Sequence, residues 1–420
     1  MSKRVKKSSL KIKSSDGDEF EVDDDIVTKM ETLKAMTMLV EDDEKEQVPT
    51  CQIDGGSMRK VILWTDYQNN FKNMNLKDTF QLIMSSDYLG NESLSEEMLR
   101  KAFLNNSDKD IDEAAKQFGD ATIIRLLDDF KRRNEVVVTY HLDMLKYYDP
   151  VKSKWITMTK IPVNVRSDKK VCVIEDRVYI LGLDDSTKLT DVAEYNAKTN
   201  IWRTISGSFQ PVIDDEDGNT FSVSFFCSVG NKLYMQSSSY TWRYDETVGE
   251  TSVKGFDLDK KDLHWNDIKT YYEPICEDDH PIVCGADDCF YLFDYGVVEK
   301  YDVEQDQWTT LTHKKPMSGY GTGLVELDGK LYVSGGGDES NSLDCYDISS
   351  DTWTTLATMN HGRSDHSLIV KNGSLIVVGG DVASIEEYDV ANDTWTVKEE
   401  NLDDKPCGGF IMRKYYLQPE

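Results

Sequence analysis

The sequence predicts a multidomain protein, with an N-terminal α/β domain followed by an all-β domain built as a closed ring of six four-stranded sheets. Three observations predict this fold class. Residues 11–133 carry apolar residues mainly at helical spacing, and the chain after residue 133 carries short β-rich runs separated by turn residues. In that second part an aromatic pair recurs about every 45 residues, which indicates a repeat architecture.

The N-terminal domain is expected to begin with a hairpin and to continue with helices. Two short alternating runs flank residues 15–18, and Asp-Gly between such runs is a strong hairpin signal. Helices are expected where apolar residues recur at helical spacing, over residues 30–39, 58–64, 79–89, 94–104, 111–118 and 122–131. Residues 1–10 precede the hairpin as a basic tail that is expected to be disordered. Its lysines and arginine form either a nuclear address or a solvated tail.

The second domain, residues 134–420, is expected to repeat one sheet six times. The aromatic pairs that mark the repeats are Tyr148/Trp155, Tyr195/Trp202, Phe256/Trp265, Tyr301/Trp308, Tyr346/Trp353 and Tyr388/Trp395. Five pairs are seven residues apart, and the third, in a repeat that carries an insertion, is nine apart with Phe in place of Tyr. On adjacent outer strands the rings would fill the space between neighbouring sheets, where an aromatic side chain buries about 150–250 Å². The pairs are therefore predicted to be structural.

The two ends of this second domain predict how the ring closes. Only "EVVVTYHLDMLKYYD" precedes the first pair, which is too little for a whole sheet, and "CGGFIMRKYYL" at 407–417 follows the last pair. Joining these segments completes the sixth sheet from both ends and removes an open edge. Gly-Gly in "LYVSGGG" (331–337) and "LIVVGG" (375–380) indicates strand ends where backbones crowd and no Cβ fits.

Composition restricts the classes of function. The formal charge of −29 argues against nucleic acids and anionic membrane surfaces as partners. No apolar run approaches the ~20 residues of a membrane span, and no secretory signal is expected. The eight cysteines are scattered without C-x-x-C spacing, so they are expected to be reduced and mostly buried, with no metal and no cofactor. The expected localisation is cytoplasmic, nuclear or both.

The repeat resembles the kelch motif over residues 136–417, most strongly in the fifth and sixth copies. This resemblance implies a six-bladed kelch β-propeller whose ligand face is built by the loops that enter the inner strands. Aligning the repeats on Gly379 places seven residues near that face, namely Arg166, Arg363, Phe221, Glu277, Asp278, Tyr320 and Lys405. Arginines and aromatics are common interface anchors, so a substrate protein with an acidic or phosphorylated segment is one expectation. The alternative is that Arg-Ser-Asp at 363–365 locks its own loop by hydrogen bonds.

The N-terminal domain resembles the Skp family of BTB/POZ-fold adaptors, from Lys11 to about Asp120. The segments that carry the resemblance stand in the family's order, and they include "KIKSSDGDEFEVDDDIV", "MRKVILW", "IMSSDYL" and "LSEEMLRKAFLNN". Skp proteins join a cullin to F-box proteins in ubiquitin ligases, so the resemblance implies a cullin contact at Asp87 and Tyr88. The family carries Asn-Tyr there, and Asp87 departs from it. The alternative for Tyr88 is ordinary inward packing on an amphipathic helix.

Two further features of the N-terminal domain leave alternatives open. Helix 122–131 carries a broad apolar face of Ile123, Ile124, Leu126, Leu127 and Phe130, which either joins the two domains or survives as a docking surface for an F-box protein. Common BTB–kelch proteins carry a helical BACK domain and an N-terminal dimerisation element. This sequence has no room for either, so a monomer is expected.

Together the two resemblances imply a substrate-recognition adaptor of a cullin–RING ubiquitin ligase, with the Skp-like domain on a cullin and the propeller on a substrate protein. Ubiquitin transfer would belong to the recruited ligase, so the chain is expected not to be an enzyme. No Ser/His/Asp or paired-carboxylate arrangement stands out, and His361 and His366 lack a third metal ligand. The alternative is a kelch scaffold or cytoskeleton-binding protein that does not engage a cullin.

Overall fold

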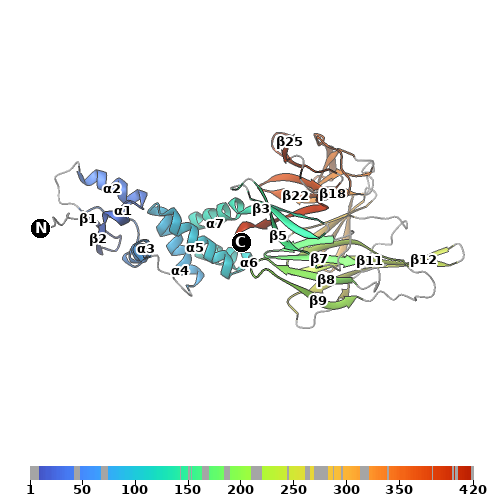
Figure 1. The fold of residues 1–420 in the computed structure, drawn as a ribbon, viewed down its shortest axis with the longest axis horizontal. Coiled ribbons are helices and arrows are strands. Elements are labelled where there is room, and N and C mark those ends of the chain that lie inside the picture. The colour runs from blue at the N-terminus through green and yellow to red at the C-terminus, as the bar shows by residue number, and fades with distance from the viewer. Residues whose placement is uncertain are drawn as a thin grey trace. The chain divides into compact units, whose positions relative to one another are not determined.

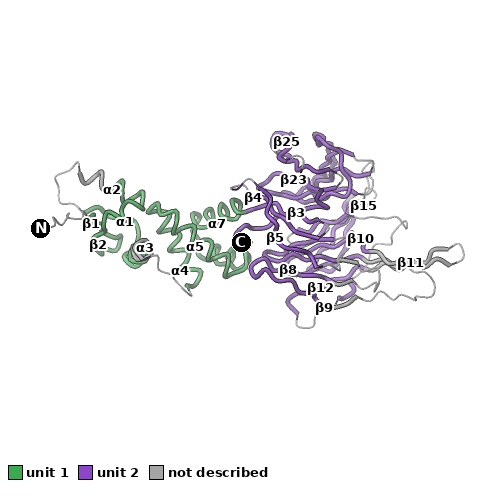
Figure 2. Tube along the Cα trace, viewed as in Figure 1, with its two compact units in different colours: residues 1–134 green, residues 135–420 purple. Residues whose placement is uncertain are grey.

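The computed structural model divides the chain into two compact units, Met1–Asn134 and Glu135–Glu420 (Figure 2). The described residues are 9–41, 48–67, 74–141, 143–149, 152, 154–162, 170–183, 190–209, 220–243, 246–260, 265–268, 282–286, 288–294, 297–312, 321–337, 340–380, 382–399, 402 and 405–417. Among them, none of the helices combines the length and the apolar character that crossing a membrane requires.

The first unit opens with the predicted hairpin. Strands β1 (Ser9–Lys13) and β2 (Glu19–Asp23) pair antiparallel, with Lys11 opposite Glu21. Gly17 takes a φ of 97°, which only glycine adopts without strain, and its N–H donates to the Ser14 carbonyl at 3.1 Å. The Asp-Gly pair therefore makes the turn because the backbone must enter this positive-φ region.

Seven helices follow in the described part of the first unit (Figure 1). They are α1 (Asp24–Val27), α2 (Glu31–Glu41), α3 (Gly55–Tyr67), α4 (Leu76–Tyr88), α5 (Glu92–Asn105), α6 (Asp108–Phe118) and α7 (Ala121–Arg133). The last four begin where a side-chain oxygen accepts a backbone N–H of the first turn, on Asn75, Asn91, Ser107 and Asp120. All six predicted helices are present, and only the one-turn helix α1 was not predicted.

Helix α7 buries part of the broad apolar face that the sequence predicts. Ile123, Leu127 and Phe130 are buried, and the Phe130 ring stacks on Phe103 with centroids 5.4 Å apart. Ile124 lies outside this stripe and is 39% exposed. The core of the first unit therefore covers one stripe of α7 and leaves the neighbouring apolar position on the surface.

The second unit is a six-bladed β-propeller, in which each blade is a four-stranded antiparallel sheet. The first blade is β26 (Gly408–Arg413), β3 (Glu135–Tyr140), β4 (Met144–Asp149) and β5 (Lys154–Lys160); the second is β6 (Lys170–Ile174), β7 (Arg177–Leu183), β8 (Thr190–Asn196) and β9 (Ile201–Phe209); the third is β10 (Thr220–Val229), β11 (Lys232–Arg243), β12 (Glu246–Asp257) and β13 (Asn266–Asp267). The fourth is β14 (Ile282–Gly285), β15 (Cys289–Asp294), β16 (Val297–Asp302) and β17 (Gln307–Thr312); the fifth is β18 (Thr322–Leu327), β19 (Lys330–Gly335), β20 (Leu343–Asp347) and β21 (Thr352–Thr355); the sixth is β22 (His366–Lys371), β23 (Ser374–Gly379), β24 (Ile385–Asp389) and β25 (Thr394–Glu399).

The first strands of the six blades form the inner ring of the propeller. Strands β6, β10, β14, β18, β22 and β26 each contact the next in this order, and β26 contacts β6. Strand β26 comes from the C-terminal end of the chain and pairs with β3 from Gly408 opposite Tyr140 to Arg413 opposite Glu135. The first blade is therefore assembled from both ends of the unit, so the ring has a hydrogen-bonded seam.

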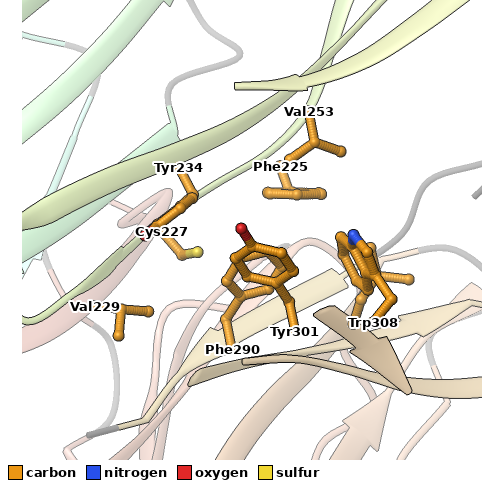
Figure 3. Packing of buried hydrophobic residues seen from close by; sticks show 9 residues of the cluster. Phe225, Cys227, Val229, Tyr234, Val253, Phe290, Tyr301 and Trp308 are labelled. Atoms are coloured by element: carbon orange, nitrogen blue, oxygen red, sulfur yellow. The ribbon is translucent and has the colours of Figure 1, made fainter. Parts of the chain in front are cut away.

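The hydrophobic cores of the propeller lie between blades. One cluster joins Phe225, Tyr234 and Val253 of the third blade to Phe290 and Trp308 of the fourth (Figure 3). Similar clusters join the second blade to the third, the fourth to the fifth and the fifth to the sixth. A smaller cluster brings Val137 and Trp155 of the first blade against the sixth. One sheet cannot cover its own faces, so the blades depend on one another for burial.

The six aromatic pairs are part of this interblade packing. In five of them the two residues stand opposite each other on the third and fourth strands of a blade, as Tyr148/Trp155, Tyr195/Trp202, Tyr301/Trp308, Tyr346/Trp353 and Tyr388/Trp395. Their ring centroids are 5.1–5.5 Å apart, and those of Phe256 and Trp265 are 5.2 Å apart. The Trp395 indole N–H donates to the Ala357 carbonyl of the preceding segment at 2.8 Å. Each pair thus packs within one blade and against its neighbour.

The tryptophans of these pairs differ in how much of the ring is buried. Trp308 is buried, and the other five are partly exposed, namely Trp155, Trp202, Trp265, Trp353 and Trp395. Four of these five still pack against interblade clusters, as Trp155, Trp265, Trp353 and Trp395. Their partners Tyr195 and Tyr346, one strand further in, are buried.

Trp202 and Trp353 illustrate how a partly exposed ring still contacts the neighbouring blade. The Trp202 indole N–H donates to the Thr159 hydroxyl of the first blade at 3.0 Å. The Trp353 ring meets Phe293 of the fourth blade edge-on, with centroids 5.9 Å apart. Trp202 therefore contacts the neighbouring blade by a hydrogen bond, and Trp353 does so by aromatic packing.

Candidate functional sites on the two units

Four of the seven residues predicted at the propeller's ligand face, Arg166, Glu277, Asp278 and Tyr320, lie outside the described residues. Phe221 lies near the start of β10, where its backbone stands opposite Ser239. Lys405 is exposed, in the segment that leads into β26. Arg363 belongs to the loop between β21 and β22, and it is the member of the set whose surroundings the structure describes in full.

Arg363 is fully buried, and its guanidinium donates to groups within the sixth blade. One terminal nitrogen donates to the Ser384 carbonyl at 2.9 Å and to the Gly379 carbonyl at 3.2 Å. The other donates to the Ser384 hydroxyl at 2.7 Å and to the Glu386 carboxylate at 3.0 Å. This pattern corresponds to the loop-locking alternative, because a guanidinium with these partners and no exposed surface does not present itself to a ligand.

Glu386 is the acceptor that organises the rest of this loop. Its carboxylate, also fully buried, accepts the backbone and side-chain N–H groups of Asn360 at 2.8 and 2.9 Å. The same carboxylate accepts the His361 backbone N–H at 3.2 Å. Sequence analysis did not select Glu386. The signal that could have found it is a carboxylate two residues before the repeat tyrosine, since Glu299 occupies the same place before Tyr301 and is also buried.

Burial, hydrogen bonds and neighbouring charges shift the pKa values of Glu386, Arg363 and His366. Burial by itself raises the pKa of Glu386. The hydrogen bonds from Arg363 and Asn360 lower that pKa by a larger amount, so the pKa of Glu386 lies below its usual value. Burial lowers the pKa of Arg363, and the bond to Glu386 partly offsets that effect. Burial, together with the charge of Arg363, lowers the pKa of His366 to about 3. At neutral pH the network is therefore a charged Arg–Glu pair beside a neutral histidine.

The two histidines that flank Arg363 have different surroundings. The His361 ring contacts Glu386 through Nδ1 at 3.1 Å and is partly exposed, whereas the buried His366 ring contacts the Ser334 hydroxyl through Nε2 at 2.8 Å. Within the described ranges, no three His, Cys, Asp or Glu side chains converge in a way that could hold a metal ion. These histidines thus belong to the hydrogen bonding of the sixth and fifth blades.

The predicted cullin-contact residues lie at the C-terminal end of α4. The helix starts at the Asn75 cap and buries Phe80, Leu82 and Ile83. Asp87 is exposed and Tyr88 is partly buried. The apolar stripe of the helix therefore anchors it in the domain, while Asp87 and part of Tyr88 remain accessible at its end.

Two contacts fix Tyr88 in this position. The Thr32 hydroxyl of α2 donates to the Tyr88 carbonyl at 2.5 Å, and the Gln52 backbone N–H donates to the Tyr88 hydroxyl at 3.4 Å. Tyr88 is thus held through its carbonyl and its hydroxyl, and its side chain is partly exposed. Thr32 and Gln52 are neighbours that the sequence pattern did not single out, because they come from segments distant in the chain.

A shallow hollow of about 280 Å³ lies along the outer face of α7. Its lining consists of Ala121, Ile124, Arg125, Asp128, Asp129 and Arg132. It contains the exposed Ile124 between side chains of both charges. This is the surface for which the sequence left open a docking role.

Comparisons with known proteins agree with the two halves described above. A family model described as "Skp1 family, tetramerisation domain" matches residues 8–70, and a "Kelch motif" model matches residues 318–360, which contain the fifth blade. Kelch-like protein 23 of Pongo abelii is 23% identical over 255 residues, covering 57% of this chain and 41% of that protein. Kelch-like protein 21 of Rattus norvegicus is 38% identical over 104 residues, covering 24% of this chain and 17% of that protein.

The matches therefore span less than half the length of these curated relatives. Among solved structures, "Structure of YjhT" is 16% identical with a TM-score of 0.47, and it covers 64% of this chain and 95% of that chain. The chain thus has an N-terminal α/β unit that matches the Skp1-family model and a C-terminal six-bladed β-propeller whose fifth blade matches the kelch motif, and it is similar to Kelch-like proteins 21 and 23.

Proposed function

We propose that this protein is a substrate-recognition adaptor of a cullin–RING ubiquitin ligase. The observation that carries the proposal is the presence of a Skp1-family domain and a kelch propeller in one chain. In this role the first unit binds the N-terminal region of a cullin, and the propeller binds a substrate protein. The chain then performs in one molecule what a Skp adaptor and a separate substrate receptor perform in two.

The proposed mechanism is proximity and uses no catalytic residue of this chain. Holding a substrate on the same assembly as a ubiquitin carrier raises the effective concentration of substrate lysines near the carrier. The monomeric chain would supply one cullin-binding surface and one substrate-binding surface. An F-box protein as a further partner would use the hollow along α7.

Asp87 and Tyr88 are the residues proposed to contact the cullin. They stand in the last turn of α4, where Asp87 is exposed and the contacts to Thr32 and Gln52 hold Tyr88 in place. A partly exposed aromatic ring beside a charged side chain suits a protein interface, since aromatic residues are frequent anchors there. The position corresponds to the Asn-Tyr of the Skp resemblance.

Asp87 itself favours a second candidate function, a kelch scaffold that uses no cullin. A carboxylate in place of the amide of the Skp resemblance removes a hydrogen-bond donor and adds a negative charge. A cullin surface that matches the amide would then bind this chain more weakly. The scaffold function would leave the propeller as the working surface of the molecule.

The test is binding of the full chain to a panel of purified cullin N-terminal domains, measured by biolayer interferometry. Asp87→Lys should weaken binding to the preferred cullin at least tenfold, because it reverses the exposed charge of the site. Tyr88→Phe should have a smaller effect, because it keeps the ring and removes only the hydroxyl. Glu113→Lys, an equal charge reversal on the exposed surface of α6, is the matched control and should bind like the unaltered chain.

The outcomes separate the two candidate functions. Binding to one cullin that is lost with Asp87→Lys and kept with Glu113→Lys would support the adaptor. Absence of binding to every cullin of the panel would rule the adaptor out in favour of the scaffold. Equal losses with Asp87→Lys and Glu113→Lys would mean that general charge, rather than the end of α4, governs the interaction.

A further inference from the structure

The loop that leads into the inner strand of the sixth blade is fixed by backbone hydrogen bonds to the fifth blade. The Arg363 N–H donates to the Ser340 carbonyl at 3.0 Å, and the Gly336 N–H donates to the Arg363 carbonyl at 3.0 Å. The Asp365 N–H donates to the carbonyl of Gly321, directly before β18, at 2.8 Å. A side chain carried by this loop is therefore already positioned, so a partner that binds it has little ordering entropy to offset.

Asp365 lies at one end of the inner ring, because it directly precedes β22, one of the six inner strands. The residue is exposed, and its φ is 51°. A positive φ is uncommon for a residue other than glycine, although Asp and Asn enter this region more readily than most. A Cβ on Gly321 would lie 2.9 Å from the Asp365 backbone nitrogen and 3.2 Å from its carboxylate oxygen. Gly321 thus leaves the space that Asp365 occupies.

His361, four residues earlier in the same loop, offers an oriented acceptor. Its side chain is 42% exposed, and its Nδ1 lies 3.1 Å from the carboxylate of the fully buried Glu386. That carboxylate is paired with Arg363, so it acts as an acceptor toward the ring. In the neutral imidazole, Nδ1 therefore carries the proton and Nε2 keeps a lone pair. The buried pair thus sets the orientation and the tautomer of a partly exposed ring.

The surface groups two residues before and two residues after Arg363, those of His361 and Asp365, are both hydrogen-bond acceptors. Arg363 itself directs its terminal nitrogens to Ser384 and Glu386 inside the sixth blade. Guanidinium and ammonium groups carry donors and no acceptor, so they complement a carboxylate and an imidazole nitrogen. The formal charge of −29 adds a long-range attraction for a basic partner. The loop therefore favours a basic segment over an acidic one.

We propose that the loop of residues 361–365 recognises an arginine- or lysine-containing segment of the substrate protein. Asp365 pairs with the basic side chain, and Nε2 of His361 accepts a hydrogen bond from the same segment. This inference rests on the proposed function, in which the propeller holds a substrate, and it assigns the chemistry of the recognised segment. It replaces the acidic or phosphorylated segment expected from the sequence, because that expectation depended in part on the guanidinium of Arg363, which the fold uses internally.

The experiment is selection of a random peptide library, displayed on phage, against the full chain, and the enriched sequences should contain Arg or Lys. As synthetic peptides they should bind Asp365→Asn at least about fivefold more weakly, because the charge is lost while Asn still tolerates a positive φ. Asp328→Asn is the matched control and should bind like the unaltered chain. Asp328 is exposed, has a φ of 53° and lies between β18 and β19, at the opposite end of the inner ring from Asp365.

A third variant, His361→Phe, tests the second contact. Phenylalanine keeps a planar ring and lacks the acceptor nitrogen, so the selected peptides should bind this variant at least about threefold more weakly. The two Asn variants have the same net charge, so general attraction of basic peptides to an acidic protein affects both equally. If thermal unfolding shows that His361→Phe is destabilised, the comparison of Asp365→Asn with Asp328→Asn decides.

Three results would overturn the inference. These are a library that yields no binding peptides, selected peptides that bind Asp365→Asn and Asp328→Asn equally, and selected peptides that are acidic. Acidic peptides that no longer bind Lys405→Gln would assign recognition to the exposed Lys405 instead. Cullin binding is measured separately with Asp87→Lys in the first unit, so failure here leaves the adaptor function standing on its own test.

Discussion

The tyrosine of each strong repeat has a role that depends on its hydroxyl as well as on its ring. Tyr301, Tyr346 and Tyr388 donate to an aspartate five residues later, at 2.6–3.0 Å. Those aspartates have φ between 50° and 52°, a region that Asp and Asn enter more readily than most residues. The spacing Tyr-Asp-x-x-x-Asp-x-Trp therefore encodes a tight turn, its lock and the aromatic pair in eight residues.

Below about pH 6.5, burial of His366 makes the free energy of unfolding depend on the pH. Its pKa is lowered from 6.5 in the unfolded chain to about 3 in the folded protein, by burial first and by Arg363 second. Between these values the unfolded state binds a proton that the folded state excludes. The stability that comes from keeping His366 neutral in the folded protein is therefore fully present above pH 6.5. As the pH falls toward 3, the free energy of unfolding decreases by at most about 1.4 kcal/mol per pH unit.

The measurement is the free energy of unfolding from pH 7 to pH 4, by chemical denaturation of the full chain and of His366→Gln. The substitution should reduce the slope of stability against pH, because glutamine does not titrate and can keep a bond to Ser334. His361→Gln is the control, since the His361 ring is partly exposed. Equal slopes in all three proteins would contradict the prediction.

The glycine that follows β23, the second strand of the sixth blade, shows how one element limits its neighbours. A Cβ on Gly380 would lie 2.3 Å from the Ser364 carbonyl oxygen, and Gly380 has a φ of 75°. Gly373, in the turn between β22 and β23, has a φ of 79° and no atom within 4 Å of the same position. The two positions therefore share the backbone conformation and differ in crowding. The prediction that no Cβ fits where the Gly-Gly strand ends is confirmed here, and that strand is the second of its blade.

This pair allows strain to be separated from collision. Gly373→Ala should lower the free energy of unfolding by about 1 kcal/mol, the cost of positive φ for a residue with a Cβ. Gly380→Ala should lower it by about 2–4 kcal/mol, because the collision with backbone adds about 1–3 kcal/mol. Thermal and urea denaturation of both variants would measure the difference. Equal losses would show that crowding contributes nothing.

At the scale of the whole molecule, the propeller depends on its seam. Strand β26 supplies six residue pairs to β3, and beyond it Lys414 pairs with Asp149 at 2.9 Å. Without β26 the first blade has no inner strand and the sixth loses the surface that covers Val378. Because blades bury their cores against one another, one missing strand exposes two interfaces at once.

Deleting residues 405–420 should therefore abolish the cooperative unfolding of the second unit. The loss should appear in near-ultraviolet circular dichroism, which reports the packed tryptophans, and in size-exclusion chromatography. A chain that ends at Leu417 keeps β26 and the short helix Lys414–Tyr416, so it should unfold like the full protein. A folded, cooperative protein after the longer deletion would disprove the dependence on the seam.

The sequence by itself determined the elements and their repeat, because these follow from local preference and spacing. Turn residues predict the hairpin of the first unit, hydrophobic periodicity predicts its helices, and the aromatic pairs predict six blades. Phe256 and Trp265 are identified even at the wider spacing, since large rings have few other ways to be buried. The closing strand is predictable because an open sheet edge is costly.

Only the tertiary structure decided which side chains remain accessible. Alignment placed Arg363 at a ligand face, yet the fold surrounds it with Ser384 and Glu386 from the following strands. The repeat spacing did not distinguish the buried Trp308 from the partly exposed Trp202 and Trp353. Local sequence sets what a residue can form, whereas accessibility depends on which distant segments arrive beside it.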